Sequence, residues 1–227
     1  MVTFLKERVV ILATVACFLS FFAIGCEENN AKPNAETQTN VHNPGEAVSD
    51  WQVALQYLKA GNKRYIENQT ITRNTNAKDR EILKDGQKPF AVVITCADSR
   101  VSPEIYFDQK LGDLFVIRNA GNIADSTVLG SIEYAVEHLK APLVVVVGHS
   151  HCGAVTGALK GGEFPENLQT IMNAICPAIK DLKTLDEAIH ANIANVVKKI
   201  KENKIVEHTG ATVIGAYYNI ETGEVLF

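Results

Sequence analysis

Three short runs of consecutive apolar residues constrain the fold of this 227-residue chain more than any other feature of its sequence. The runs are residues 90–95, 114–117 and 143–147. Strands that are covered on both faces, as in parallel sheets, have such runs in place of an alternating pattern. Apolar residues at helical spacing separate and follow the runs, over residues 126–139, 166–179 and 186–201. Because strands that alternate with helices form parallel sheets, we expect a single-domain α/β fold with a mainly parallel central sheet flanked by helices.

Further elements are expected at both ends of this α/β pattern. Residues 51–58 carry apolar side chains at helical spacing, and a serine and an aspartate that suit a helix cap precede them. Residues 211–218 and 224–227 have the composition of strands, and the turn residues 222–223 separate them. The folded domain is therefore expected to span residues 50–227.

The beginning of the chain has the layout of an export signal. Lys6 and Arg8 precede an uncharged, largely apolar stretch over residues 9–25, and polar residues follow at once. A basic start, an apolar middle and small residues before a break are typical of a secretory signal peptide, here residues 1–25. The pair at residues 25–26 resembles the lipobox of bacterial lipoproteins, in which the cysteine, here Cys26, is lipidated. Ala23 stands where that motif usually has leucine.

An uncleaved membrane anchor is the alternative for the same segment, because seventeen residues are at the short end of what can span a bilayer. Both interpretations predict export, to the periplasm or the cell surface of a bacterium, with the protein held at a membrane by its N-terminus. The following residues, 26–49, are polar and rich in asparagine, so we expect a flexible tether between the lipidated cysteine and the domain.

Charge and cysteine content exclude two classes of protein. The net charge is −4, and no run of lysine and arginine offers a surface that could follow a nucleic acid backbone. Five cysteines, widely spaced, are too few for a disulfide scaffold. We therefore expect no nucleic acid partner and look for another role for the cysteines.

Two clusters of polar residues follow two of the predicted strands. Cys96 and Asp98 come directly after the first run, and His149 and Cys152 come directly after the third. Loops at the carboxyl ends of parallel strands converge at one edge of the sheet, so these side chains can meet. Two thiolates and one imidazole favour zinc over magnesium or calcium, and three protein ligands leave a position for water, as in catalytic zinc sites. The alternative is two unrelated buried cysteines and a histidine that caps a helix.

At these positions the chain resembles the β-class carbonic anhydrases. The resemblance covers about residues 50–227 and rests on four motifs. They are Cys96-Ala-Asp98-Ser-Arg100, residues 115–122 (Phe-Val-Ile-Arg-Asn-Ala-Gly-Asn), His149-Ser-His-Cys152-Gly153, and residues 215–223. It implies an enzyme that interconverts carbon dioxide and bicarbonate through attack of a zinc-bound hydroxide on carbon dioxide.

The resemblance also implies roles for single residues. Cys96, His149 and Cys152 would hold one zinc ion per chain. Asp98 would accept a hydrogen bond from the hydroxide while Arg100 holds it, and would bind the metal itself only in a closed, inactive form. His151, between the two last ligands, is expected not to bind the metal.

The substrate site and the assembly are implied in the same way. Gln87 and the backbone N–H of Gly153 would bind substrate oxygens, and Phe115 and Tyr134 would line an apolar pocket for carbon dioxide. Members of the family form dimers or larger assemblies with the active site at the subunit boundary, so a homo-oligomer, a dimer or tetramer, is expected. One branch has a regulatory bicarbonate site that uses a tryptophan and an arginine. Arg118 is present here, but Val93 stands at the tryptophan position, so we expect no such regulation.

Two other functions fit the same ligands. The scaffold could hydrolyse CS2 or COS, since the metal site would be the same. It could also be a catalytically dead module that binds zinc or bicarbonate. The presence of both Asp98 and Arg100 argues against the second, because a purely structural zinc has no need of that pair.

Overall fold

The computed structural model describes residues 41–43, 45–71 and 76–227. The predicted signal peptide, the predicted lipidation site Cys26 and the tether as far as residue 40 lie outside the described residues. Within the described residues, no helix is both long enough and apolar enough to cross a membrane.

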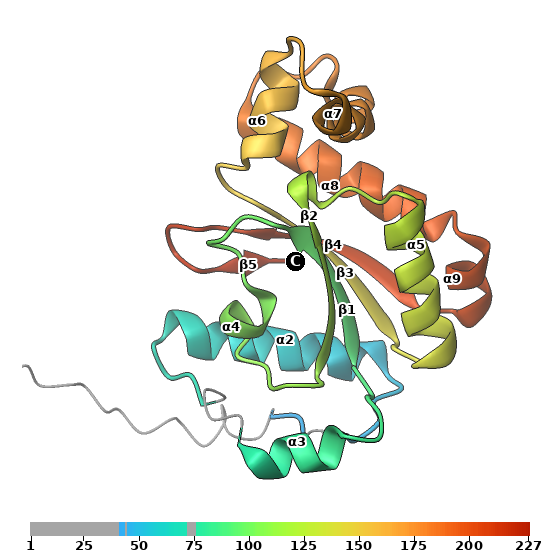
Figure 1. Cartoon of the computed structure of the whole chain (residues 1–227). Helices are drawn as coiled ribbons and strands as arrows, with labels where there is room; N and C mark the ends of the chain where they lie inside the picture. Colours follow the sequence, from blue (N-terminus) through green and yellow to red (C-terminus); the bar gives the residue numbers. More distant parts are fainter. Residues whose placement is uncertain (1–40, 44, 72–75) are drawn as a thin grey trace, which may run out of the picture. The chain divides into compact units, whose positions relative to one another are not determined.

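A five-stranded sheet forms the centre of the domain, with the strand order β2-β1-β3-β4-β5 (Figure 1). The first four strands in this order are parallel, and the short β5 runs antiparallel to β4. The strands are β1 (Ala91–Cys96), β2 (Leu114–Asn119), β3 (Leu143–His149), β4 (Thr212–Tyr218) and β5 (Val225–Leu226). The predicted α/β fold with a mainly parallel sheet is confirmed.

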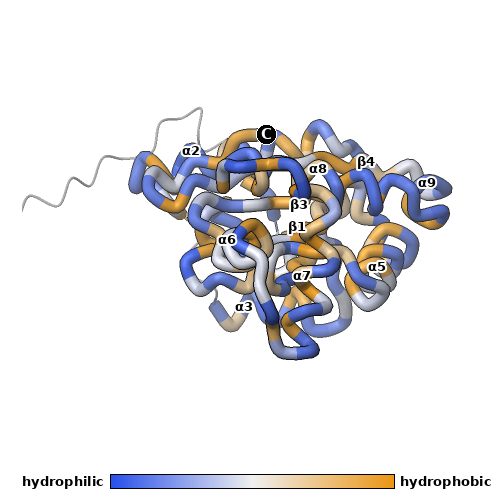
Figure 2. The backbone as a smooth tube through the Cα atoms, turned by 90° about the horizontal axis from the view of Figure 1, so that it is seen from above, coloured by the Kyte–Doolittle hydropathy of each residue, from blue (hydrophilic) through white to orange (hydrophobic). Residues whose placement is uncertain are grey.

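Helices cover both faces of the sheet, and each face has its own apolar core. On one face lie α5 (Ser126–Glu133), α6 (Gly153–Lys160), α7 (Glu166–Ile179), α8 (Leu185–Lys201) and α9 (Lys204–Thr209). On the other face lie α2 (Trp51–Ile66) and α4 (Pro103–Tyr106), while α3 (Ala77–Leu83) has no buried residue. The trace coloured by hydropathy shows the central strands enclosed by helices of mixed polarity (Figure 2).

Local capping explains where the helices begin. Asp50 accepts a hydrogen bond from the backbone N–H of Gln52 (2.8 Å) at the start of α2, which is where the sequence places a capping residue. Thr184 accepts one from the N–H of Glu187 (3.3 Å) at the start of α8. The helix predicted over 126–139 changes pitch, because α5 continues into a π-helical turn, η2 (Tyr134–His138).

Burial of the strands follows the prediction for two of the three apolar runs. Every residue of β1 and β3 is buried, as expected for strands covered on both faces. The residues of β2 are only half-buried, and Arg118 is exposed. The reason is position, since β2 is an edge strand and, among the described residues, pairs only with β1. The prediction that residues 114–117 are buried on both faces is therefore wrong within a single chain.

The last part of the predicted tether packs on the domain. His42 is 2% exposed, and its Nδ1 lies 2.7 Å from Asp113 Oδ1. Its ring meets those of Tyr57 and Phe90 edge-on, with centroid distances of 5.5 and 5.1 Å. The packed structure therefore begins earlier than residue 50, because one buried histidine attaches the preceding segment.

A buried ion pair holds α2 against the turn after α4, and it yields a stability prediction. Arg64 Nε donates to Asp108 Oδ2 (2.6 Å), and both side chains are 1% exposed. Arg64→Met should lower the free energy of unfolding by about 3–5 kcal/mol, because it removes the guanidinium group that balances the buried Asp108 carboxyl group. Urea denaturation followed by circular dichroism measures the change.

The exposed pair Lys84–Glu81, with a similar N–O distance of 2.7 Å, is the matched control. Lys84→Met should cost less than about 1 kcal/mol, because solvent screens this pair. If both variants lost the same free energy of unfolding, burial would not be the reason that the Arg64–Asp108 pair stabilises the protein.

Candidate metal centre

The parallel pairing of β1 and β3 brings two predicted ligands to the same edge of the sheet. Thr95 lies opposite Val147, so Cys96 and His149 both stand where their strands end. Cys152 follows three residues later and is the N-cap residue of α6. The third ligand position is therefore set by the turn that joins β3 to α6.

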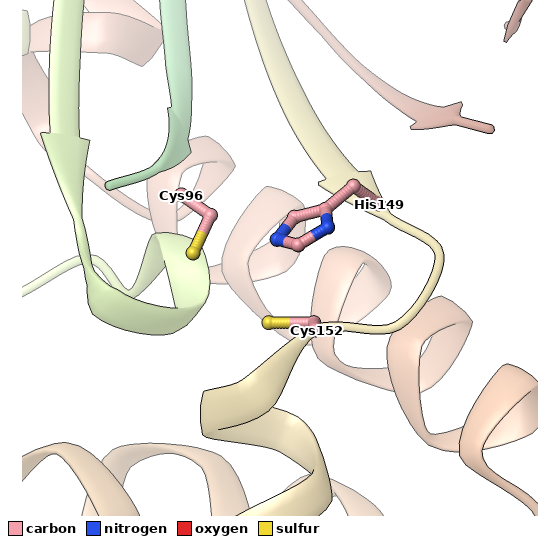
Figure 3. Close-up of side chains that lie close together, drawn as sticks. All are labelled: Cys96, His149 and Cys152. Atoms are coloured by element: carbon pink, nitrogen blue, oxygen red, sulfur yellow. The ribbon is translucent and has the colours of Figure 1, made fainter. Parts of the chain in front are cut away.

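The three side chains converge (Figure 3). The sulfurs of Cys96 and Cys152 and a ring nitrogen of His149 all lie within 4.8 Å of one another. Exposure is 5% for Cys96, 1% for Cys152 and 0% for His149. Other polar side chains that the sequence singles out lie outside this group: Asp98 is held by Arg100, and His151 is exposed and faces Glu221 Oε1 (3.2 Å).

The hydrogen bonds of His149 prepare it as a ligand. Its Nδ1 lies 2.8 Å from the carbonyl oxygen of Ser150, which can only accept, so Nδ1 carries the proton. Nε2 then has a free lone pair. It is buried and has no hydrogen-bond partner among the described residues. Because a buried polar atom without a partner is costly, this nitrogen fits a metal ion, and the neighbouring thiols complete a soft donor set.

The two thiols share their protons unequally. A hydrogen bond from Cys152, and a weaker contribution from the Gly121 N–H, hold the pKa of Cys96 well below its usual range despite its burial. The pKa of Cys152 is raised far above its usual range by the hydrogen bond to Cys96 and by burial. Without a cation, the pair therefore holds one proton near neutral pH. Two thiolates so close together need a positive charge between them.

Arg100 fixes the carboxylate of Asp98 next to this group. Arg100 Nε donates to Asp98 Oδ1 (2.9 Å), and Nη2 donates to Oδ2 (2.7 Å). These bonds, together with one from the Arg100 backbone N–H, hold the pKa of Asp98 well below its usual range. Asp98 is therefore an ionised acceptor in a fixed orientation.

Of the four predicted substrate-binding residues, only Gly153 lies beside the metal ligands, as the first residue of α6. Gln87 is exposed and precedes β1, and Phe115 lies opposite Val92 near the start of that strand. The ring of Tyr134 lies 6.2 Å from that of Phe115. Because a strand rises about 3.3 Å per residue, these three residues lie well over 10 Å along the sheet from Cys96 of their own chain. The structure does not bring them to the metal centre of the same chain.

Arg118 has a supporting role that sequence reasoning missed. Its Nη2 donates to the carbonyl oxygen of Asp98 (2.7 Å), and its Nε donates to that of Cys96 (3.2 Å). The side chain therefore braces the loop that carries both a metal ligand and the paired carboxylate. Arg118 lies within the motif at residues 115–122, but the sequence of that motif does not indicate these two contacts.

Comparison with known proteins gives a consistent family. A family model described as carbonic anhydrase matches residues 91–225. The carbonic anhydrase of Mycolicibacterium smegmatis is 40% identical over 186 residues, covering 76% of this chain and 90% of that protein.

Two solved structures are similar as well. The β-carbonic anhydrase CcaA is 32% identical with a TM-score of 0.60, over 72% of this chain and 93% of that chain. A tetrameric β-carbonic anhydrase of Sordaria macrospora is 26% identical with a TM-score of 0.60, over 78% of this chain and 94% of that chain.

The unequal thiol pair predicts a proton count. At pH 6 and under reducing conditions, binding of one Zn²⁺ to the metal-free protein should release about one proton per chain, because Cys96 is already ionised and Cys152 is not. A pH indicator in weakly buffered solution measures the release. Cys176→Ser, which alters a thiol outside the group, should give the same count. At pH 6 a zinc-bound water keeps its proton, so release of two protons would contradict the ionised state of Cys96.

Proposed function

This chain belongs to the β-class carbonic anhydrases, and we propose that it uses one Zn²⁺ per chain to hydrate carbon dioxide reversibly to bicarbonate and a proton. The observation that carries the proposal is the convergence of Cys96, His149 and Cys152 directly beside the Asp98–Arg100 pair. A zinc that only stabilised the fold would need the first three residues and not the pair.

The metal ligands would be Cys96 Sγ, Cys152 Sγ and His149 Nε2. When bound, zinc supplies a Lewis acid that lowers the pKa of water from 15.7 to about 7 in a three-histidine site. The thiolates would neutralise more of the metal's charge than histidines do. The pKa of the water would therefore depend more on charged groups outside the three ligands. Asp98, two residues after Cys96, is an ionised group outside the ligand set.

Asp98 orients the attacking oxygen. Its carboxylate stays ionised and is held by two parallel hydrogen bonds from Arg100, so it accepts a hydrogen bond in one direction only. An oxygen held at this centre by such a bond would have a fixed orientation toward carbon dioxide, which is the kind of positioning that lowers the entropy cost of reaction. Gly153 begins α6, and its N–H, at the positive end of the helix, suits the anion that forms.

We further propose that the active site is completed by a second copy of the chain. Gln87, Phe115 and Tyr134 are too far along the sheet to reach the metal centre of their own chain. The half-buried apolar edge strand β2 offers a surface for association. A similar β-carbonic anhydrase is a tetramer, which supports a homo-oligomer here.

A regulatory bicarbonate site is not part of this proposal. Val93 is fully buried in the core and has no hydrogen-bond donor in its side chain, so an anion beside it would lack a partner. Arg118 is already engaged with two backbone carbonyl groups. Asp98 therefore stays on Arg100, and bicarbonate acts only as substrate or product.

Asp98 and Arg100 supply the test that separates catalysis from metal binding. Asp98→Asn and Arg100→Ala should bind zinc as the parent does, yet lose about 10²–10⁴-fold in the rate of carbon dioxide hydration, because only the orientation of the attacking oxygen is disturbed. Stopped-flow hydration and metal analysis of the same samples measure both effects.

Two further variants calibrate that experiment. Cys96→Ala should lose both zinc and activity, and Glu221→Gln, an exposed change near the site edge, should lose neither. An Arg100→Ala enzyme as fast as the parent would refute the role of the pair. Hydrolysis of CS2 or COS by the parent, without carbon dioxide hydration, would move the function to that other reaction.

We propose that the enzyme is exported and held at a bacterial membrane through a lipid on Cys26, which rests on the sequence of the first 30 residues. Cys26→Ser should move the protein from the membrane fraction to the soluble fraction or leave it as an unprocessed precursor. Mass spectrometry of the mature N-terminus measures the outcome in the parent. A diacylated Cys26 is expected, and an unmodified Met1 would contradict processing.

A further inference from the structure

The loop between β2 and α5 is closed by its own side chains. Asn119 Nδ2 donates to the carbonyl oxygen of Ile123 (2.9 Å), and the Ile123 N–H donates back to Asn119 Oδ1 (2.9 Å). Between them, Gly121 and Asn122 have φ values of +74° and +44°. Glycine and asparagine are among the residues that adopt this left-handed region most readily, so the sequence suits the turn.

The function of this conformation is visible at Gly121. Its N–H donates to Cys96 Sγ (3.4 Å), so the loop directs a backbone dipole at a metal ligand. The loop also packs tightly, since a Cβ at Gly121 would lie 2.7 Å from Ile175 Cδ1 and 3.1 Å from Ala154 Cβ. Only glycine satisfies both the positive φ and this close approach to α7 and α6.

Asn192 reaches the same loop from α8. It lies between Ile189 and Ile193 on the buried side of the helix and is 1% exposed. Its Nδ2 donates to the carbonyl oxygen of Gly121 (2.9 Å). An amide in an apolar core costs free energy unless it is hydrogen-bonded, and Asn192 Oδ1 has no partner among the described residues. The bond from Nδ2 to Gly121 is therefore the contact that this buried amide contributes.

The two hydrogen bonds at Gly121 act together. One holds the carbonyl group of Gly121, and the other uses its N–H, so the peptide groups on both sides of its Cα are fixed. Loss of the first bond would remove this partner of the Gly121 carbonyl group and leave the peptide group free to rotate. The N–H would then no longer point at Cys96.

We propose that Asn192 is a positioning residue of the metal centre, which holds Gly121 so that its N–H hydrogen-bonds the Cys96 thiolate. The inference rests on the proposed zinc site. A donor on a thiolate draws electron density from the sulfur and fixes the direction of its lone pairs. Groups that orient metal ligands in this way typically contribute about 10–100-fold to metal affinity.

Asn192→Leu tests the proposal, because leucine has a similar size and no donor. In competition with a chelator, the variant should bind Zn²⁺ about 10–100-fold more weakly than the parent. In the Co²⁺-substituted protein, the sulfur-to-cobalt charge-transfer band should move to longer wavelength, since a thiolate without its donor gives up electrons more easily. A purely structural role would not move that band.

Asn62→Leu is the matched control. Asn62 is also a buried asparagine (5% exposed) whose Nδ2 donates to backbone carbonyl groups, those of Tyr106 and Gly223, but it belongs to the other face of the sheet. It should lower stability and leave the band and the zinc affinity unchanged. An Asn192→Leu protein with the parent's band and affinity would overturn the proposal, as would an equal band shift in both variants.

Two further measurements guard against a variant that does not fold. Asn192→Ala removes the donor and adds neither bulk nor charge to the core, so it should give the same band shift. In the parent loaded with ¹¹³Cd²⁺, the Gly121 amide proton should show coupling to the metal through Cys96 Sγ, and its absence would also overturn the proposal. If the parent bound no Co²⁺ through sulfur, the proposed zinc site would fail instead.

Discussion

The parallel pairing of β1 with β3 is the constraint on which the site depends. Thr95 opposite Val147 sets the register, and both strands then leave the sheet at the same edge, with Cys96 and His149 as their last residues. A slip of one residue would turn every side chain of β1 to the opposite face and separate the ligands. Because both strands are completely buried, the apolar cores on the two faces oppose such a slip. The core therefore determines the metal site as well as the stability of the domain.

Polar groups around this edge refine what the register brings together. Arg118 braces the backbone of the loop after β1, and Arg100 holds the Asp98 carboxylate within that loop. Gly121 approaches the Cys96 sulfur from the loop after β2. Each group acts on a different part of the site. Arg118 holds the backbone at Cys96 and Asp98, Arg100 fixes the Asp98 carboxylate, and the Gly121 N–H contacts the Cys96 sulfur. Such support is what distinguishes a preorganised site from a chance meeting of cysteines and histidine.

The sequence predicts those parts of the structure that depend on local pattern. Consecutive apolar residues identify β1 and β3, and the order of polar residues after them identifies three side chains that the structure brings together. The edge position of β2 is not predictable in this way, because burial depends on which strands become neighbours. His42 gives no periodic signal, yet it attaches residues before Trp51 to the domain.

Spacing along the chain is a poor guide to distance in space at two other places. Gln87 precedes Asp98 by few residues, but the intervening strand carries it to the opposite end of the sheet. Asn192 is far from Cys96 in sequence and acts on it through Gly121. A single asparagine in an amphipathic helix does not reveal such a contact, because its partner lies on a loop whose path is set by tertiary packing.

X-ray absorption at the zinc edge of the purified protein tests the central claim most directly, because it counts the sulfur and nitrogen neighbours of the metal. The account predicts one zinc per chain with two sulfur neighbours at about 2.3 Å and the remaining nitrogen or oxygen neighbours at about 2.0–2.1 Å. A spectrum with only nitrogen and oxygen neighbours, or with four sulfurs, would contradict a metal centre built from Cys96, His149 and Cys152.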